Sequence, residues 1–257
     1  MRRRIASVGA GGALLTAAML SISPLAVSTV AAQEKMEKPA IPGTFSANVA
    51  VTSEYLFRGI SQTDDAPALQ GGFDYEVSLA EPVALYLGVW GSNVDFNEAA
   101  GVDGATVEID GYGGLRGTVP GTRLSWDAGF IYYAYPGADS NLEYDFWEVT
   151  ASLGYDFGVA SVTGSVNWSP DNTGDTGYET YTKLAVDVPV PVVKDLSLSA
   201  YVANQDLDQG DSYVEWNFSV GYSIAGFGLS VAYSDTDISP AADGNGEAVI
   251  FTISRSF

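Results

Sequence analysis

Residues 44–58 read TFSANVAVTSEYLFR, and apolar side chains alternate with polar ones along this stretch. In an extended chain Phe45 and Val49 point to one side, whereas Ser46 and Asn48 point to the other. A two-residue repeat with one apolar face predicts a half-buried β-strand rather than a helix. The stretch therefore predicts a protein built from strands.

The same alternation recurs along the rest of the chain and predicts twelve strands. They span residues 44–58, 68–79, 83–94, 106–118, 123–135, 144–157, 159–169, 178–188, 195–204, 212–224, 227–234 and 247–257. Most of them reach the roughly 9–11 residues that a tilted strand needs to cross a bilayer. The boundaries also accommodate ten or fourteen strands.

The connections between these strands alternate in length and chemistry. Short links fall at residues 80–82, 119–122, 158, 189–194 and 225–226, and longer acidic loops fall at 59–67, 95–105, 136–143, 170–177, 205–211 and 235–246. Short turns at one end and long loops at the other are typical of an outer-membrane barrel. The sequence thus predicts an all-β fold, a transmembrane antiparallel up-and-down β-barrel, with both termini in the periplasm and the acidic loops outside the cell.

The N-terminus has the pattern of an export signal. Residues 2–4 are all arginine, and residues 5–30 are uncharged and rich in small apolar side chains. A small-residue site ending at Ala32 fits cleavage by a signal peptidase. We therefore expect a signal peptide at residues 1–32, a periplasmic leader at 33–43 and an outer-membrane barrel at 44–257.

Composition excludes several classes of function. The formal charge is −21, which argues against nucleic acid as a partner because phosphates need Lys and Arg. The chain contains no Cys and no His, so it lacks thiolate chemistry, the commonest general base and the commonest metal ligand. We expect no enzymatic activity, catalytic residue, metal or cofactor; a hydrolase would have to use a Ser–Lys pair instead.

Charged residues at alternate strand positions are expected to line the barrel lumen, because a charge facing lipid is costly. This predicted set comprises Glu54, Arg58, Asp74, Glu76, Glu108, Asp110, Arg116, Asp127, Glu148, Lys183, Asp187 and Glu215. Acid outnumbers base in it, which predicts a preference for cations. Arg58, expected at the end of the first strand, either filters solutes or forms a structural ion pair with Asp74 or Glu76. A solid hydrogen-bonded core without conduction fits the same pattern.

Aromatic residues gather near both ends of the predicted strands, as in the two aromatic girdles of a membrane barrel. The rings expected near the long loops are Tyr55, Phe57, Tyr132, Tyr144, Phe146, Trp168, Tyr178, Tyr213 and Tyr233. The chain ends in Phe257 after alternating apolar residues, which resembles the signal that barrel-assembly machinery reads in outer-membrane proteins. Arg255 stands at a position on that face where an apolar residue is typical, and its guanidinium is expected to reach the lipid headgroups.

Three segments resemble the TorF family of porins. They are residues 48–75 (NVAVTSEYLFRGISQTDDAPALQGGFDY), 86–96 (YLGVWGSNVDF) and 131–137 (IYYAYPG). The resemblance implies a location in the bacterial outer membrane and a pore for passive diffusion. With the acidic lumen, it leads us to expect small cationic or neutral solutes, and outer-membrane lipids and lipopolysaccharide as neighbours. The alternative is a non-conducting structural or adhesion barrel, which acidic external loops suit equally well.

Overall fold

The computed structural model describes residues 41–96, 102–239, 244 and 246–257. The predicted signal peptide at 1–32 and most of the leader at 33–43 lie outside the described residues. All twelve predicted strands fall within the described part of the chain.

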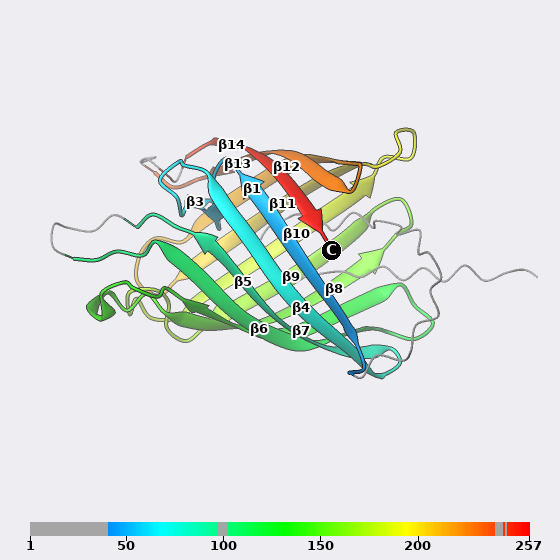
Figure 1. Ribbon diagram of the computed structural model, residues 1–257, viewed down its shortest axis with the longest axis horizontal. Coiled ribbons are helices and arrows are strands. Elements are labelled where there is room, and N and C mark those ends of the chain that lie inside the picture. The colour runs from blue at the N-terminus through cyan, green and yellow to red at the C-terminus, as the bar shows by residue number, and fades with distance from the viewer. Residues whose placement is uncertain (1–40, 97–101, 240–243, 245) are drawn as a thin grey trace, which may run out of the picture.

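Twelve long strands form one closed antiparallel barrel, in which each strand pairs with its neighbours in the chain (Figure 1). They are β1 (Thr44–Thr52), β4 (Ala68–Ala80), β5 (Val83–Asn93), β6 (Val107–Thr118), β7 (Leu124–Ala134), β8 (Phe146–Asp156), β9 (Ser161–Ser169), β10 (Glu179–Pro189), β11 (Leu196–Leu207), β12 (Tyr213–Ile224), β13 (Phe227–Thr236) and β14 (Ala248–Ser256). The predicted fold and its count of twelve strands are confirmed. Among the described residues, two short strands, β2 (Leu56–Phe57) and β3 (Ile60–Ser61), pair only with each other, and one 3₁₀ turn covers Ser140–Leu142.

The prediction for the first strand is wrong at its end. Strand β1 stops at Thr52 rather than continuing to residue 58. Its side chains alternate as expected up to that point, where pairing with β4 ends at Ala68 and pairing with β14 ends at Thr252. Beyond Thr52 the chain leaves the wall. Arg58 therefore does not lie on the first wall strand.

The barrel closes where β1 meets β14. The two strands pair from Asn48 opposite Ser256 to Thr52 opposite Thr252. The last residue extends this seam, because the Phe257 amide donates to the Ala47 carbonyl at 2.9 Å and the Ala47 amide donates to the Phe257 carbonyl at 3.2 Å. The wall consequently has no unpaired strand edge.

The two faces of the wall differ sharply in chemistry. Outward positions carry large apolar side chains that are widely exposed, such as Leu153 (58%) and Ile253 (55%). Inward positions carry Ser, Thr, Asn, Tyr and the charged side chains. An apolar exterior around a polar interior is the arrangement of a transmembrane β-barrel. Within the described ranges, no helix is long and apolar enough to span a membrane.

The connections sort by length as the sequence predicts. The links after β4, β6, β8, β10 and β12 contain two to six residues and lie at one end (Figure 1). The connections at the other end are longer, except for the link between β11 and β12, which covers only residues 208–212. At the short-turn end, the Arg255 guanidinium lies 5.1 Å from the Phe227 ring centroid and 5.2 Å from that of Phe257. The charge of Arg255 on the outer face is thus held between two rings.

The predicted girdle near the long loops is wrong for four of its rings. Tyr55, Phe146 and Tyr213 are 3%, 4% and 7% exposed and lie inside the barrel, and Phe57 on β2 packs against the buried Tyr133. Tyr132, Trp168, Tyr178 and Tyr233 are exposed on the outside as expected. Tyr55, Phe57 and Phe146 pack together in one aromatic cluster, whereas the Tyr213 hydroxyl donates to the Arg58 carbonyl at 2.9 Å.

The two faces predict different responses to a new charge in the middle of β13. Val231 faces outward, and its neighbour Ala232 faces a lumen cavity of about 90 Å³. We expect Val231→Lys to lower the free energy of unfolding by about 2–4 kcal/mol, because the ammonium faces lipid. Ala232→Lys is the matched control and is expected to cost less. Denaturant unfolding in lipid vesicles measures both, and an equal loss would contradict the assignment of the faces.

Candidate functional site in the barrel lumen

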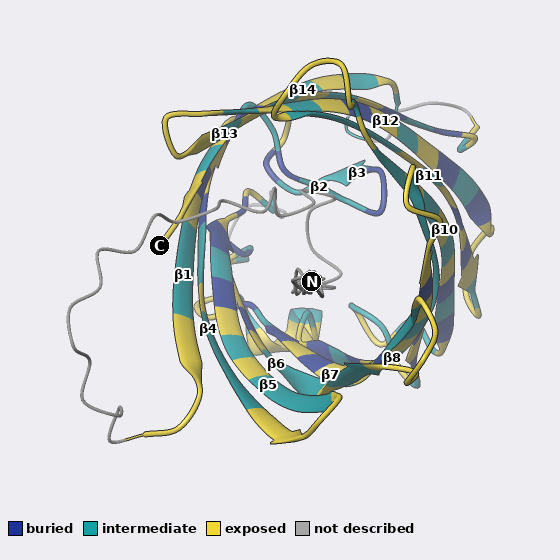
Figure 2. Cartoon of the chain, turned by 90° about the vertical axis from the view of Figure 1, so that its right-hand side faces the viewer, coloured by how far each residue is buried: buried dark blue, intermediate teal, exposed yellow. Residues whose placement is uncertain are grey.

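A hairpin built from β2 and β3 projects into the lumen. Figure 2 shows both strands inside the ring formed by the wall. The pairs are Leu56 with Ser61 and Phe57 with Ile60, so only Arg58 and Gly59 form the turn. The sequence predicted residues 56–58 as the end of the first wall strand and residues 59–61 as part of an external loop, whereas this segment lies inside the barrel.

The turn has positive φ at both of its residues, 52° at Arg58 and 78° at Gly59. This backbone is that of a type I′ turn, the usual two-residue connection of a hairpin. At Gly59 a Cβ atom would lie 2.5 Å from Cγ2 of Thr236, so the tip of the hairpin packs directly against β13. Glycine therefore satisfies both the backbone angle and the close approach.

The base of the hairpin is anchored by hydrogen bonds on both sides. The Gln62 amide donates to the Tyr55 carbonyl at 2.8 Å, and the Asp95 amide donates to the Gln62 carbonyl at 2.8 Å. The Tyr55 hydroxyl donates to Glu108 at 2.8 Å, and its ring packs edge-on against Trp90 with centroids 5.5 Å apart. The hairpin is thus fixed to β5 and β6 on one side of the barrel.

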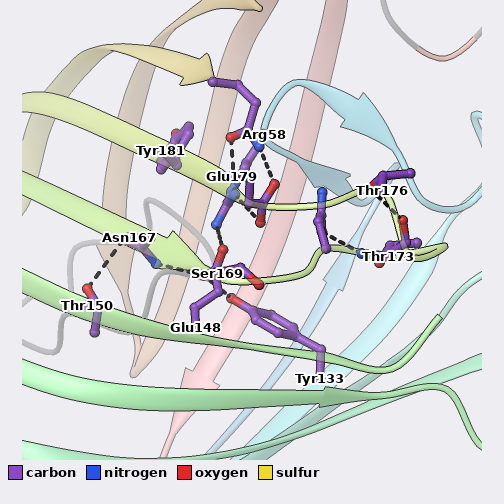
Figure 3. A network of polar contacts seen from close by, with 12 residues as sticks. Arg58, Tyr133, Glu148, Thr150, Asn167, Ser169, Thr173, Thr176, Glu179 and Tyr181 are labelled. Carbon is purple, nitrogen blue, oxygen red and sulfur yellow. Dashed lines mark hydrogen bonds and ion pairs between the residues drawn. The ribbon is translucent and has the colours of Figure 1, made fainter. Parts of the chain in front are cut away.

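Arg58 points from the turn toward polar side chains of the wall (Figure 3). Its Nη1 donates to Glu179 Oε1 at 2.9 Å and to Gln205 Oε1 at 3.1 Å, and its Nη2 forms an ion pair with Glu148. The guanidinium carbon lies 4.5 Å from the centroid of the Tyr181 ring. We call Glu148, Glu179, Gln205 and Tyr181 the guanidinium cage.

The whole contact is buried, because Arg58 is 8% exposed while Glu148 and Glu179 are 0% and 1% exposed. Burial lowers the pKa of the Arg58 guanidinium, and the carboxylates of Glu148 and Glu179 raise it more strongly, so the net pKa lies above its ordinary value. Arg58 is therefore charged, and its guanidinium links β8 and β10, which lie on either side of β9. The predicted partners Asp74 and Glu76 are wrong, because Glu148 and Glu179 hold Arg58 instead.

The predicted lumen residues of β4 to β7 lie at inward positions, and most have a partner. Asp74 accepts from the Tyr112 hydroxyl at 2.5 Å, Asp127 accepts from the Tyr86 hydroxyl at 2.9 Å, and Glu76 forms an ion pair with Arg116. Asp110 is fully buried, and neither of its carboxylate oxygens has a hydrogen-bond partner among the described residues. Glu108, which binds Tyr55, lies next to it on the same face of β6.

The remaining predicted lumen residues lie on β10, on β12 and before the hairpin. Glu215 accepts hydrogen bonds from the hydroxyls of Tyr181 and Tyr201, and the Lys183 ammonium lies 5.4 Å from the Tyr201 ring centroid. Asp187 accepts from Ser199 at 2.6 Å. Glu54 lies just before β2, and partial burial raises the pKa of its carboxyl. No group of three or more acidic residues in the described segments is arranged to hold a metal ion.

The cage contains functional groups that the sequence interpretation missed. Glu179 was not among the predicted lumen residues, although it shares the parity of Lys183 and Asp187 along β10. Glu179 lies four residues before Lys183, within the predicted strand 178–188, so the same alternation predicts that it faces inward. Gln205 and Tyr181 are uncharged, so the search for charged lumen residues passed over them.

The lumen is chemically divided. Carboxylates and tyrosines occupy the inward positions of β4 to β8, whereas the cavity of about 90 Å³ beside the hairpin is lined mostly by uncharged polar groups, among them Thr52, Asn217, Ser219 and Thr252. A second cavity of about 190 Å³ lies on the long-loop side of the hairpin and includes Arg58 and Glu179. The hairpin separates these two spaces.

A closed antiparallel barrel with an apolar outside and a charged inside belongs to the class of transmembrane β-barrels. Residues 36–257 match the family described as "Bacterial protein of unknown function (Gcw_chp)", and the chain belongs to this family. No curated protein matches the sequence.

The fold is similar to that of a solved porin structure. The KdgM porin is 8% identical, with a TM-score of 0.52 over 82% of this chain and 98% of that chain. An outer membrane channel from Pseudomonas putida F1 is 12% identical, with a TM-score of 0.48 over 88% of this chain and 100% of that chain. At such low identity the likeness describes architecture alone.

The burial of the Arg58 contact predicts a large effect on stability. Arg58→Ala leaves two carboxylates buried without their cation, and we expect it to lower the free energy of unfolding by about 3–5 kcal/mol. Arg116→Ala is the matched control, because the side chain of its partner Glu76 is 38% exposed and water can replace the lost charge. Denaturant titration of the refolded barrels measures the difference. Equal losses in the two variants would contradict a structural role for the buried pair.

Proposed function

We propose that the protein is a porin-like channel of the bacterial outer membrane through which small solutes diffuse passively. The observation that carries the proposal is the polar, charged interior of a closed barrel whose exterior is apolar. A barrel that served only as an anchor would have no need of so many ionisable groups inside. The resemblance to TorF-family porins, the architecture of the KdgM porin and the pattern of an export signal support the same function.

We propose that the solutes are cationic or neutral. Carboxylates outnumber basic groups at the inward positions, and the long loops at the mouth are acidic as well. Acidic groups along a narrow pore attract cations and repel anions. In the same proposal, Phe257 is read by the assembly machinery, and the acidic loops face lipopolysaccharide.

The hairpin supports a second candidate function. It occupies part of the cross-section (Figure 2), and Arg58 in its turn pairs with Glu148 and Glu179 of the wall. If the hairpin closes the passage completely, the protein is a non-conducting structural or adhesion barrel. Conductance distinguishes the two candidates directly.

We expect purified, refolded protein to produce stepwise conductance in planar bilayers, with K⁺ passing more readily than Cl⁻. The measurement is single-channel current and reversal potential under a salt gradient. Protein heat-denatured before addition is the control. Bilayers that stay silent at a high protein load would favour the structural barrel.

The charge preference predicts the behaviour of a triple variant. Neutralising Glu54, Asp74 and Glu76 together, as Glu54→Gln, Asp74→Asn and Glu76→Gln, should move the reversal potential toward zero because the lumen loses negative charge. Glu81→Gln, in an exposed short turn, is the control and should shift it far less. A triple variant with the reversal potential of the native protein would mean that these side chains do not line the path.

A further inference from the structure

The guanidinium cage is assembled by contacts within the wall. Glu148 Oε2 accepts from the Tyr133 hydroxyl at 3.1 Å and from Asn167 Nδ2 at 2.9 Å (Figure 3). Glu179 Oε2 accepts from the amide of Gln205, and the Tyr181 hydroxyl donates to Glu215. None of these contacts involves the hairpin. Each cage member is therefore held in place by residues of β7 to β12.

The acceptor atoms of the cage that these contacts leave unused face one point in the lumen. Oε1 of Glu148, Oε1 of Glu179 and Oε1 of Gln205 all accept from Arg58, and the Tyr181 ring lies beside its guanidinium. Three acceptors and an aromatic ring match the planar fork of a guanidinium better than the single point charge of an ammonium. The cage thus has the chemistry of a binding site for this group.

The electrostatic balance of the cage also favours a cation. Two buried carboxylates face a single guanidinium, so with both carboxylates ionised the cage has one negative charge in excess when Arg58 is present and two without it. Buried carboxylates without a partner are costly. An empty cage would therefore attract a cation strongly.

A cavity connects the cage with the long-loop side of the barrel. Its volume is about 190 Å³, and Asn172 and Thr173 of the loop after β9 line it together with Glu179 and Gln205. The neighbouring loops carry Asp171, Asp175 and Asp208, which raise the local concentration of cations. A small cation arriving from the loops would reach the cage through this cavity.

Arg58 itself belongs to a small element. The hairpin has a ladder of only two residue pairs, and its turn adds the Tyr213 hydroxyl bond to the Arg58 carbonyl at 2.9 Å. The occupant of the cage is therefore carried by a separate segment that is not part of the wall.

We propose that the guanidinium cage is a solute-binding site for guanidinium compounds, occupied in this structure by the protein's own Arg58. A guanidinium solute competes with Arg58 for Glu148, Glu179 and Gln205, and the hairpin acts as an internal competitor. The proposal deepens the channel function and rests on it only for the route by which the solute arrives. It names the class of solute for which the lumen is built.

The test uses ethylguanidinium, because Arg58→Ala removes the equivalent of this fragment from the cage. Calorimetry in detergent micelles measures its binding to the native barrel and to R58A. We expect R58A to bind at least about tenfold more tightly than the native protein, because the competing side chain is gone. Ethylammonium carries the same charge without the fork and is expected to bind R58A at least about tenfold more weakly than ethylguanidinium does.

A triple variant separates the cage from general attraction of cations. R58A/E148Q/E179Q retains the other lumen acids and should lose the binding of ethylguanidinium. Equal binding to R58A and the triple variant, or equal binding of ethylguanidinium and ethylammonium to R58A, would overturn the proposal. If R58A does not refold, R58K serves in its place, since an ammonium fills only part of the cage; no gain in ethylguanidinium affinity over the native protein would then refute it.

Conductance is measured separately, so that the two proposals fail independently. Ethylguanidinium should reduce the K⁺ current through R58A and leave that through R58A/E148Q/E179Q unchanged. Binding in micelles without any current in bilayers would support the cage and refute the channel. Current without specific binding would support the channel and refute the cage.

Discussion

Closure of the wall between β1 and β14 is the constraint on which the rest of the structure depends. A strand in contact with lipid has no water to satisfy its amides and carbonyls, so every edge must be paired. Here the pairing runs from Asn48 to Thr52 and is extended by the backbone of Phe257. Because the ring is closed, inward and outward positions are fixed for all twelve strands. The division between apolar outside and charged inside follows from this geometry.

Inside the ring, the Arg58 ion pairs determine the position of the hairpin. Buried ion pairs often contribute little net stability, because the cost of desolvation offsets the attraction. The directions of the Arg58 hydrogen bonds are more informative here than their net contribution to stability. Arg58 satisfies acceptors on β8, β10 and β11 at the same time, which places the turn at one point of the cross-section. At the base of the hairpin Tyr55 packs against Trp90, and beside the turn Phe57 packs against Tyr133, so both ends of the hairpin are held.

Much of the wall could be predicted from the sequence, because alternation and loop length are local signals. All wall strands other than β1 begin and end within three residues of their predicted bounds. The end of β1 could not be found in this way. Alternation continues through Tyr55 and Phe57, and a ring that faces lipid has the same sequence pattern as a ring that packs against a hairpin. The Arg58-Gly59 turn was the only local signal, since Gly tolerates the positive φ of a type I′ turn.

The alternation with a period of two also predicted which charged strand residues face inward. It could not predict which of these residues meet inside the lumen. Arg58 and Glu148 are 90 residues apart, and Arg58 and Glu179 are 121 apart. Such pairs depend on the diameter of the barrel and the path of the hairpin. The sequence interpretation therefore identified Arg58 as an important charge and assigned it the wrong partners.

The seam at the C-terminus has a consequence for biogenesis. The outer partner of β1 is β14, and the hydrogen-bonded side chains of Thr52 and Thr252 in this seam are separated by 200 residues of sequence. The ring therefore cannot close until nearly all of the barrel strands are available to pair. Until β14 arrives, the closing edge of β1 is unpaired, and unpaired strand edges are prone to aggregation. Closure of the barrel is consequently a late step of folding, because it joins two segments that are far apart in the sequence.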